Sequence, residues 1–316
     1  MNLSINDRIK GSLMGVAIGD ALGFSTEFLS KEDAIKLYPE GISSYNEIII
    51  DSFRTQEQIG KWTDDTDMMI AILDSLIAKK TIDLHDIANN FIVWKNSQPF
   101  DIGNLTRTVL MHSNYLNSPI EIAKKVWEEE GKQSAGNGGI MRTTISALWN
   151  YTNWNEIKQN TENLCKLTHY DPRCVGSCVI IAYLIHNILL NQPFTKSDII
   201  KLGAEYHSDI EKYIELGCQP NLSTLRLDDD ETMGYTLKTM AVGLWFYNFA
   251  PNYFEGIQSI ILEGGDADTN CAVAGGILGA KFGYESIPLH LTEDLKDSEM
   301  LLAKIDKLLE VINIKE

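Results

Sequence analysis

The chain has 316 residues, of which 44% are hydrophobic, and a formal net charge of −17. This length can bury one large core, and no Pro-, Ser- or Gly-rich linker divides the sequence, so we expect a single domain over residues 1–316. The negative charge argues against non-specific binding to nucleic acid or to an anionic membrane, because both need a basic surface. The five cysteines include no CxxC pair and fit a reducing cytoplasm.

Apolar residues recur at three- and four-residue spacing in several segments, and strand-like stretches are nearly absent, which predicts an all-α fold. The first helix, over 6–25, has a glycine at every fourth position from Gly11 to Gly23. Each glycine destabilises a helix by about 1 kcal/mol relative to alanine, so this ridge makes sense only if another backbone or a ligand comes very close. The helix expected over 269–282 repeats the small-residue theme.

The remaining helices are expected, in chain order, at 31–38, 64–79, 83–97, 104–116, 119–130, 140–150, 155–168, 172–190, 196–217, 231–249, 253–262 and 295–313. Residues 44–50 alternate weakly and are the one stretch that we expect to be extended. The longest apolar run, 174–190, is slightly short for a membrane span and carries polar residues, so we interpret it as a buried central helix. The acidic run 227–231 is typical of a solvated loop and helix start.

Two acidic segments precede apolar helices far apart in the sequence. Residues 62–67 read Trp-Thr-Asp-Asp-Thr-Asp, and residues 264–270 read Gly-Gly-Asp-Ala-Asp-Thr-Asn. One such segment alone would be explained by helix capping. Two together hold more aspartates than two caps require, and if they meet in space their repulsion needs a counter-ion. Oxygen-only ligands favour Mg²⁺ or Mn²⁺, and acidic pairs from two helices could hold two ions about 3.5–4 Å apart.

Five further positions have both a structural and a functional interpretation. Asp20 interrupts an apolar helix face and could be a buried, hydrogen-bonded carboxylate, whereas Glu27 lies beyond the helix end, where loops carry chemistry more often. Residues 101–104, Asp-Ile-Gly-Asn, either cap a helix or contribute to a site. The glycine-rich loop 134–142 could hold a phosphate or diphosphate on its N–H groups, although it lacks the Walker Gly-Lys-Ser/Thr. His169 stands at a helix start, where a structural role is the alternative.

Five ordered motifs make the chain resemble the ADP-ribosylglycohydrolase family. They are Gly-Asp-Ala-Leu-Gly at 19–23 followed by Glu27, Trp-Thr-Asp-Asp-Thr at 62–66, Asp-Ile-Gly-Asn at 101–104, Gly-Asn-Gly-Gly-Ile-Met-Arg at 136–142, and Gly-Asp-Ala-Asp-Thr-Asn at 265–270. The resemblance implies a compact single-domain, orthogonal all-α bundle with a dinuclear Mg²⁺ or Mn²⁺ centre in a cleft.

The resemblance also implies a role for each motif. The metal ligands would be Thr63, Asp64, Asp65, Asp266, Asp268 and Thr269. The substrate-binding residues would be Asn104, Gly136, Asn137, Gly138, Gly139 and His169. Two carboxylates would be catalytic, with Asp101 positioning a guanidinium or acting as a base, and Glu27 gating the cleft or transferring a proton.

The implied activity is metal-dependent removal of ADP-ribose from modified protein side chains. ADP-ribosyl-arginine is favoured because the Asp101 motif resembles that of the arginine-directed members. Alternatives are another ADP-ribosyl linkage, such as serine or O-acetyl-ADP-ribose, and an immunity-type protein that binds and neutralises an ADP-ribosylating toxin. The expected partners are an ADP-ribosylated protein and ADP-ribose, and we expect a cytoplasmic monomer without nucleic acid or membrane.

Overall fold

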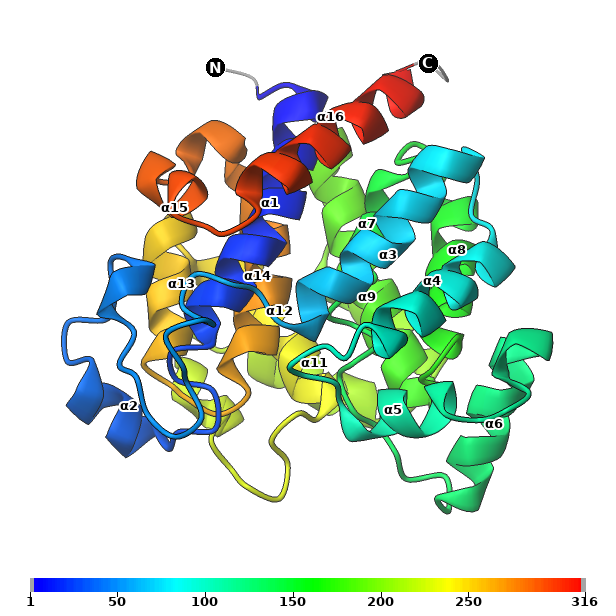
Figure 1. The fold of residues 1–316 in the computed structure, drawn as a ribbon, viewed down its shortest axis with the longest axis horizontal. Coiled ribbons are helices and arrows are strands. Elements are labelled where there is room, and N and C mark those ends of the chain that lie inside the picture. Colours follow the sequence, from blue (N-terminus) through cyan, green and yellow to red (C-terminus); the bar gives the residue numbers. More distant parts are fainter. Residues whose placement is uncertain (1–2, 314–316) are drawn as a thin grey trace.

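Helices and connecting loops account for the whole of the computed structural model, which describes residues 3–313 (Figure 1). The longer helices are α1 (Ile5–Gly23), α3 (Asp64–Lys79), α4 (Leu84–Asn96), α6 (Pro119–Glu129), α8 (Trp154–Lys166), α9 (Pro172–Leu190), α12 (Thr236–Phe249), α14 (Ala267–Phe282) and α16 (Ser298–Asn313). The shorter ones are α2 (Lys31–Leu37), α5 (Asn104–Leu110), α7 (Thr144–Leu148), α10 (Lys196–Ala204), α11 (Asp209–Gly217), α13 (Tyr253–Ile261) and α15 (Leu289–Glu293). Residues 3–313 form no strand, which confirms the predicted all-α fold.

Helices α1 and α14 form the tightest contact of the fold, and their glycines explain it. A Cβ atom added at Gly15 would lie 2.2 Å from the carbonyl oxygen of Gly275, and one added at Gly23 would lie 2.3 Å from that of Ala267. Residue numbers thus rise along α1 while those of the contacting residues on α14 fall, so the two helices are antiparallel. The C-terminal end of α1 consequently lies beside the N-terminal end of α14. The close approach predicted from the glycine ridge is an approach of one backbone to another.

Helix α9 is buried in the middle of the core, as predicted. By length and composition alone it could cross a membrane, but 83% of its apolar stretch lies inside the protein. It packs against α7, α8 and α12, so its apolar side chains serve the core.

The prediction of an extended segment at 44–50 is wrong. Residues Tyr45–Glu47 form a short 3₁₀ turn, η1, and no neighbouring strand pairs with this stretch within residues 3–313. Side chains satisfy its polar groups instead, because the N–H of Ile49 donates to the Tyr38 hydroxyl at 2.8 Å. The Tyr45 hydroxyl in turn donates to the Leu291 carbonyl at 2.8 Å, which holds the segment against α15.

Four predicted helices have clearly different bounds in the structure. The helix expected over 104–116 ends at Leu110 and is followed by a 3₁₀ turn, η2 (Tyr115–Asn117). The helix expected over 140–150 is reduced to α7, because residues 141–143 form a turn. The helix expected over 196–217 is divided into α10 and α11, because the chain turns back to pack Ile210 on Gly203, where an added Cβ would lie 2.5 Å from the Ile210 Cγ2 atom. The helix expected over 231–249 begins only at Thr236, because the preceding residues form a loop in which Gly234 has a φ of +75°. The sequence analysis predicted no helix at the position of α15.

Candidate metal centre and cleft

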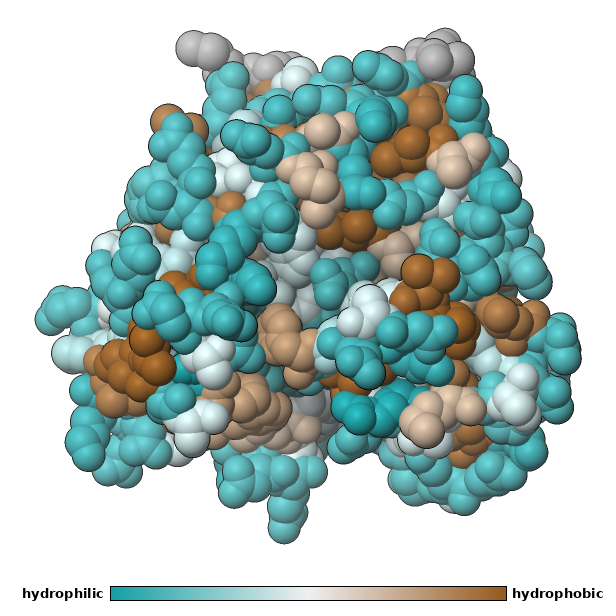
Figure 2. Space-filling model, viewed as in Figure 1, coloured by the Kyte–Doolittle hydropathy of each residue, from teal (hydrophilic) through white to brown (hydrophobic). Residues whose placement is uncertain are grey.

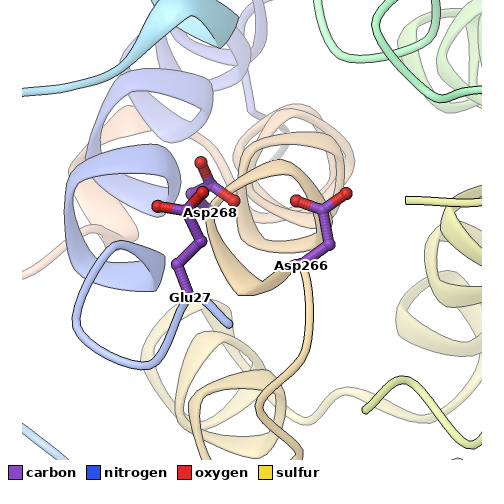
Figure 3. A group of neighbouring side chains, drawn as sticks. All are labelled: Glu27, Asp266 and Asp268. Atoms are coloured by element: carbon purple, nitrogen blue, oxygen red, sulfur yellow. The ribbon is translucent and has the colours of Figure 1, made fainter. Parts of the chain in front are cut away.

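The antiparallel pairing of α1 and α14 brings three carboxylates together. Glu27 lies on the loop after α1, while Asp266 and Asp268 lie at the start of α14. One oxygen from each carboxylate falls within 4.8 Å of the other two. Figure 3 shows the Glu27 and Asp268 side chains close together, with Asp266 to one side on the segment leading into α14. This group could hold a metal ion.

The start of α3 adds the first acidic segment to the same cluster. The Thr63 Oγ1 atom lies 3.3 Å from the Asp65 Oδ2 atom and 3.4 Å from the Asp268 Oδ2 atom. The Thr269 Oγ1 atom lies 3.3 Å from the same Asp65 oxygen. All four side chains are buried. The two acidic segments therefore meet in space, which is the condition under which the sequence predicted a metal site.

Helix capping does not explain the first segment. Thr63 occupies the N-cap position of α3, but its side chain makes no capping hydrogen bond. Asp20 on α1 caps α3 instead, since its carboxylate accepts the N–H of Thr63 at 2.9 Å and the N–H of Thr66 at 3.1 Å. The Thr63 hydroxyl is thereby free to face Asp65 and Asp268. Asp20 is the buried, hydrogen-bonded carboxylate that the sequence suggested.

Several carboxylate oxygens in the cluster have no hydrogen-bond partner among the described residues. They are the Glu27 Oε2, Asp65 Oδ1 and Asp268 Oδ1 atoms. Burial raises the pKa of each of these three carboxyl groups well above its ordinary value, and neighbouring carboxylates raise it further. Buried negative charges need a counter-charge. Carboxylate and hydroxyl oxygens without nitrogen or sulfur fit a hard cation such as Mg²⁺ or Mn²⁺.

The two remaining predicted ligands line the open side of the cluster. The Asp64 Oδ2 atom accepts the N–H of Gly103 at 3.2 Å, and burial followed by the Asp101 charge raises the pKa of Asp64 to about 8. The Asp266 Oδ2 atom accepts the Asn137 Nδ2 hydrogen at 2.6 Å. Asp64 thus contacts the segment that carries Gly103, and Asp266 contacts the glycine loop.

A cleft of about 390 Å³ opens above this cluster. Of the residues predicted as site residues, it is lined by Glu27, Asp64, Asp101, Asn104, Gly136, Asn137, Gly138, His169, Asp266, Asp268 and Thr269. Thr63 and Asp65 lie buried below its floor. Gly139 is also buried, since a Cβ added there would lie 2.9 Å from the Cys165 Sγ atom. Gly139 therefore supports the loop from behind and does not line the cleft.

The glycine loop and His169 form another part of the cleft wall. The N–H of Asn137 donates to the Gly234 carbonyl at 3.0 Å, which fixes the loop, while the N–H of Gly138 has no acceptor within residues 3–313. A Cβ added at Gly138 would lie 2.8 Å from the His169 Cε1 atom. Only glycine leaves room for the imidazole here. An N–H group and an imidazole on one wall could bind an anionic group.

A buried hydrogen-bond chain orients His169. The Arg142 Nη2 atom donates to the Thr168 Oγ1 atom at 2.6 Å, and that oxygen lies 2.7 Å from the His169 Nδ1 atom. Because a guanidinium only donates, the Thr168 hydroxyl has its own hydrogen to give to Nδ1, which favours the neutral tautomer with the proton on Nε2. Burial, assisted by the Arg142 charge, lowers the pKa of His169 to about 3. His169 is therefore an uncharged hydrogen-bond donor toward the cleft.

The sequence did not indicate several residues of the site. Those lining the cleft are Phe28, Leu105, Thr106, Met233 and Gly234. Met233 and Gly234 follow the acidic run 227–231, which was interpreted only as a solvated loop. Arg142 ends the glycine-loop motif and Thr168 precedes His169, but no local pattern shows that these two residues contact each other. Arg54 carries no motif at all, yet its buried guanidinium donates from Nε to the Phe24 carbonyl at 2.9 Å and also contacts the Glu27 carbonyl.

Comparison with known proteins shows a match over nearly the whole chain. A family model described as ADP-ribosylglycohydrolase matches residues 1–315. The chain is 27% identical over 311 residues to the ADP-ribosyl-dinitrogen reductase glycohydrolase of Rhodospirillum rubrum, with 97% of each chain covered. It is 26% identical over 302 residues to the ADP-ribosylarginine hydrolase Tri1 of Serratia proteamaculans, covering 93% of this chain and 77% of that one.

Other relatives also match this chain over most of their length. The human ADP-ribosylhydrolase ARH3 is 25% identical over 326 residues, with 89% of this chain and 87% of that protein covered. A solved structure described as an ADP-ribosylglycohydrolase-related protein complex superposes with a TM-score of 0.69 at 24% identity, covering 98% of this chain and 99% of that one. That likeness concerns the fold alone.

An all-helical chain with this cleft and these relatives is an enzyme of the class that hydrolyses ADP-ribosyl bonds. The chain belongs to the ADP-ribosylglycohydrolase family. The family depends on metal ions, and the acidic cluster of Glu27, Asp266 and Asp268 could bind one.

Proposed function

We propose that this protein removes ADP-ribose from modified arginine side chains of proteins by hydrolysing the N-glycosidic bond. The main observation that supports this proposal is that Asp101 and Glu27 line the same cleft beside the acidic cluster. A positively charged guanidinium leaving group pairs well with carboxylates. Two of the relatives described above are likewise named for ADP-ribosyl bonds, one of them for ADP-ribosylarginine.

The proposed metal ligands are the six residues Thr63, Asp64, Asp65, Asp266, Asp268 and Thr269, with two Mg²⁺ or Mn²⁺ ions as the cofactors. When bound, such ions orient the vicinal ribose hydroxyls and lower the pKa of water. The unpartnered oxygens of Asp65 and Asp268 support this assignment, because nothing in the described chain neutralises them.

The two catalytic carboxylates have different environments. In the protein without bound metal, burial raises the pKa of Glu27, and the charges of Asp101, Asp266 and Asp64 raise it further. Glu27 would pass a proton from the water that adds to the anomeric carbon to the departing guanidine nitrogen, through an oxocarbenium-like state. Asp101 is less buried than Glu27, and it would position the guanidinium.

The glycine loop, His169 and Asn104 would bind the rest of the substrate. The N–H of Gly138 and the Nε2 hydrogen of His169 would donate to the diphosphate, and Asn104 and Asn137 would contact the nucleotide portion. An uncharged histidine suits this role because its donor is present at every pH above its lowered pKa of about 3.

A release assay on two defined substrates tests the proposal. One protein carries ADP-ribosyl-arginine and the other carries ADP-ribosyl-serine, and each is incubated with Mg²⁺ or with excess chelator. We expect metal-dependent release of ADP-ribose from the arginine substrate alone. Release from the serine substrate alone would overturn the role of Asp101, and release from neither would overturn the proposed activity.

A further inference from the structure

Three phenylalanines are exposed together next to the cleft. Phe28, Phe53 and Phe100 have 59%, 39% and 49% of their surface exposed, respectively. Their rings are linked by contacts with centroids 5.4–6.0 Å apart, either directly or through the buried Phe24. We call these three exposed residues the phenylalanine rim. On the face shown in Figure 2, apolar side chains are exposed in the lower part of the molecule between α2 and α5.

Contacts with the neighbouring backbone and with Arg54 hold Phe28 and Phe53 in the rim. The N–H of Phe28 donates to the Gly265 carbonyl at 2.8 Å, which ties the loop to the segment that carries Asp266. The Arg54 guanidinium carbon lies 5.4 Å from the Phe53 ring centroid, and its charge is paired with Asp51 at 2.6 Å. Exposed aromatic clusters of this kind are costly in water and usually mark a contact surface.

The position of the rim identifies what it would contact. Phe28 directly follows Glu27 and lines the cleft, and Phe100 directly precedes Asp101. The rim thus borders the part of the cleft that holds Glu27 and Asp101. In the proposed reaction the leaving side chain pairs with the carboxylates, so the polypeptide that carries this side chain must leave the cleft past the rim.

The charges around the rim indicate which residue types that polypeptide would contain. The Glu27 and Asp101 carboxylates lie inside the rim, and the positive charge of Arg54 is already paired with Asp51. Beyond Phe100, Lys61 and Lys296 share a small hollow with Asp67 and Asp297, so that side adds no net charge. An apolar surface on a chain of net charge −17 favours an apolar segment rich in Arg and Lys.

We propose that the phenylalanine rim docks the apolar, basic polypeptide segment that flanks the modified arginine in the protein substrate. This inference rests on the proposed function. It adds a second contact outside the cleft, which a small substrate without a polypeptide cannot use.

The test compares two substrates in each of four proteins. The substrates are free ADP-ribosyl-arginine and a short peptide with ADP-ribosyl-arginine flanked by Leu and Lys. The proteins are the unaltered chain, Phe53→Ser, Phe100→Ser and the matched control Phe249→Ser, because Phe249 is also 39% exposed but lies at the far end of α12. Phe28 is left unchanged because it lines the cleft itself.

We expect kcat/KM for the peptide to fall about tenfold in each rim variant, as for an aromatic contact at an interface. Turnover of free ADP-ribosyl-arginine should stay unchanged, and Phe249→Ser should match the unaltered chain on both substrates. A peptide with Asp and Gly flanks should be processed more slowly than the Leu/Lys peptide, with a difference that shrinks as salt is added.

Three results would overturn the inference, and they are distinguishable. Equal kcat/KM for the peptide in rim variants and the unaltered chain would show that the rim docks nothing. An equal fall on both substrates would place the rim in nucleotide binding or in folding of the site. No turnover of either substrate by the unaltered chain would overturn the proposed function, and this inference would fall with it.

Discussion

The Asp20 carboxylate on α1 accepts hydrogen bonds from both the backbone N–H and the hydroxyl of Thr66 on α3, at 3.1 and 2.6 Å. Asp20 thus caps a helix that belongs to another part of the chain. The residue in the N-cap position, Thr63, is released to face the acidic cluster. A buried carboxylate that does not contact the cleft therefore positions residues that we propose to bind metal.

The first prediction concerns this contact. Thr66→Val removes the hydroxyl and leaves a buried oxygen of Asp20 with one partner fewer, so the free energy of unfolding should fall by about 1–3 kcal/mol. Metal affinity should also fall, because the start of α3 is held less firmly. Thr66→Ser keeps the hydroxyl and should retain most of the affinity. Denaturant unfolding and calorimetric titration with Mg²⁺ measure the two effects, and equal behaviour of both variants would contradict the capping role.

The second prediction concerns the glycine ridge. In Gly15→Ala the new Cβ would lie 2.2 Å from a backbone oxygen of Gly275, which no side-chain rotation can relieve. The free energy of unfolding should fall by about 3 kcal/mol, the upper part of the range for overpacking. Gly103→Ala is the control, because its nearest neighbour, the Thr106 Oγ1 atom, would be 3.9 Å away. Similar unfolding midpoints for the two variants would refute the packing argument.

Local patterns predicted much of this molecule. The helix expected at 64–79 has these bounds in the structure, because an acidic N-terminus and an apolar periodicity both mark it. The glycine ridge predicted a close approach, although the identity of α14 as its partner is visible only in the fold. The weak alternation over 44–50 was misleading, since a strand needs a neighbour and none is present within residues 3–313.

Contacts between distant segments were not predictable. Arg54 holds the Glu27 loop from a stretch without any motif, and Gly234 fixes the glycine loop although it follows an acidic run. Such residues act through a partner far away in sequence, so neither composition nor periodicity marks them. The relatedness to the family supplied roles for the motif residues but none for these.

The third prediction concerns the orientation of His169. Thr168→Val removes the hydroxyl between Arg142 and the imidazole, so the ring loses its preference for the proton on Nε2. The affinity for ADP-ribose should fall about tenfold, the loss expected for one hydrogen bond to a charged group. Thr168→Ser should restore it. Nitrogen chemical shifts of labelled histidine report the tautomer directly, and an unchanged spectrum in Thr168→Val would argue against the chain of hydrogen bonds.

The fourth prediction concerns pH. Burial raises the pKa of Asp20 to about 7 and that of Asp64 to about 8, whereas both are near 4 in an unfolded chain. The folded protein without metal therefore binds more protons than the unfolded protein between these values. Its stability should fall as the pH rises from about 4 to about 8.

Bound Mg²⁺ should remove most of this dependence, because the cation supplies the counter-charge that protons supply in the metal-free protein. Thermal unfolding with chelator and with saturating Mg²⁺ at each pH measures the effect. A metal-free protein that becomes more stable with rising pH would show that these carboxyl groups do not have raised pKa values.

The central claim is that the acidic cluster carries a metal-dependent hydrolysis of ADP-ribosyl bonds. The most direct test measures release of ADP-ribose from an arginine-modified protein by the unaltered chain, by Asp268→Asn and by Asp230→Asn, each with Mg²⁺ and with chelator. Asp230 is exposed outside the cleft and controls for the loss of one charge. We predict release by the unaltered chain and Asp230→Asn with Mg²⁺ only, and background release by Asp268→Asn. Full activity of Asp268→Asn, or activity that survives the chelator, would contradict the account.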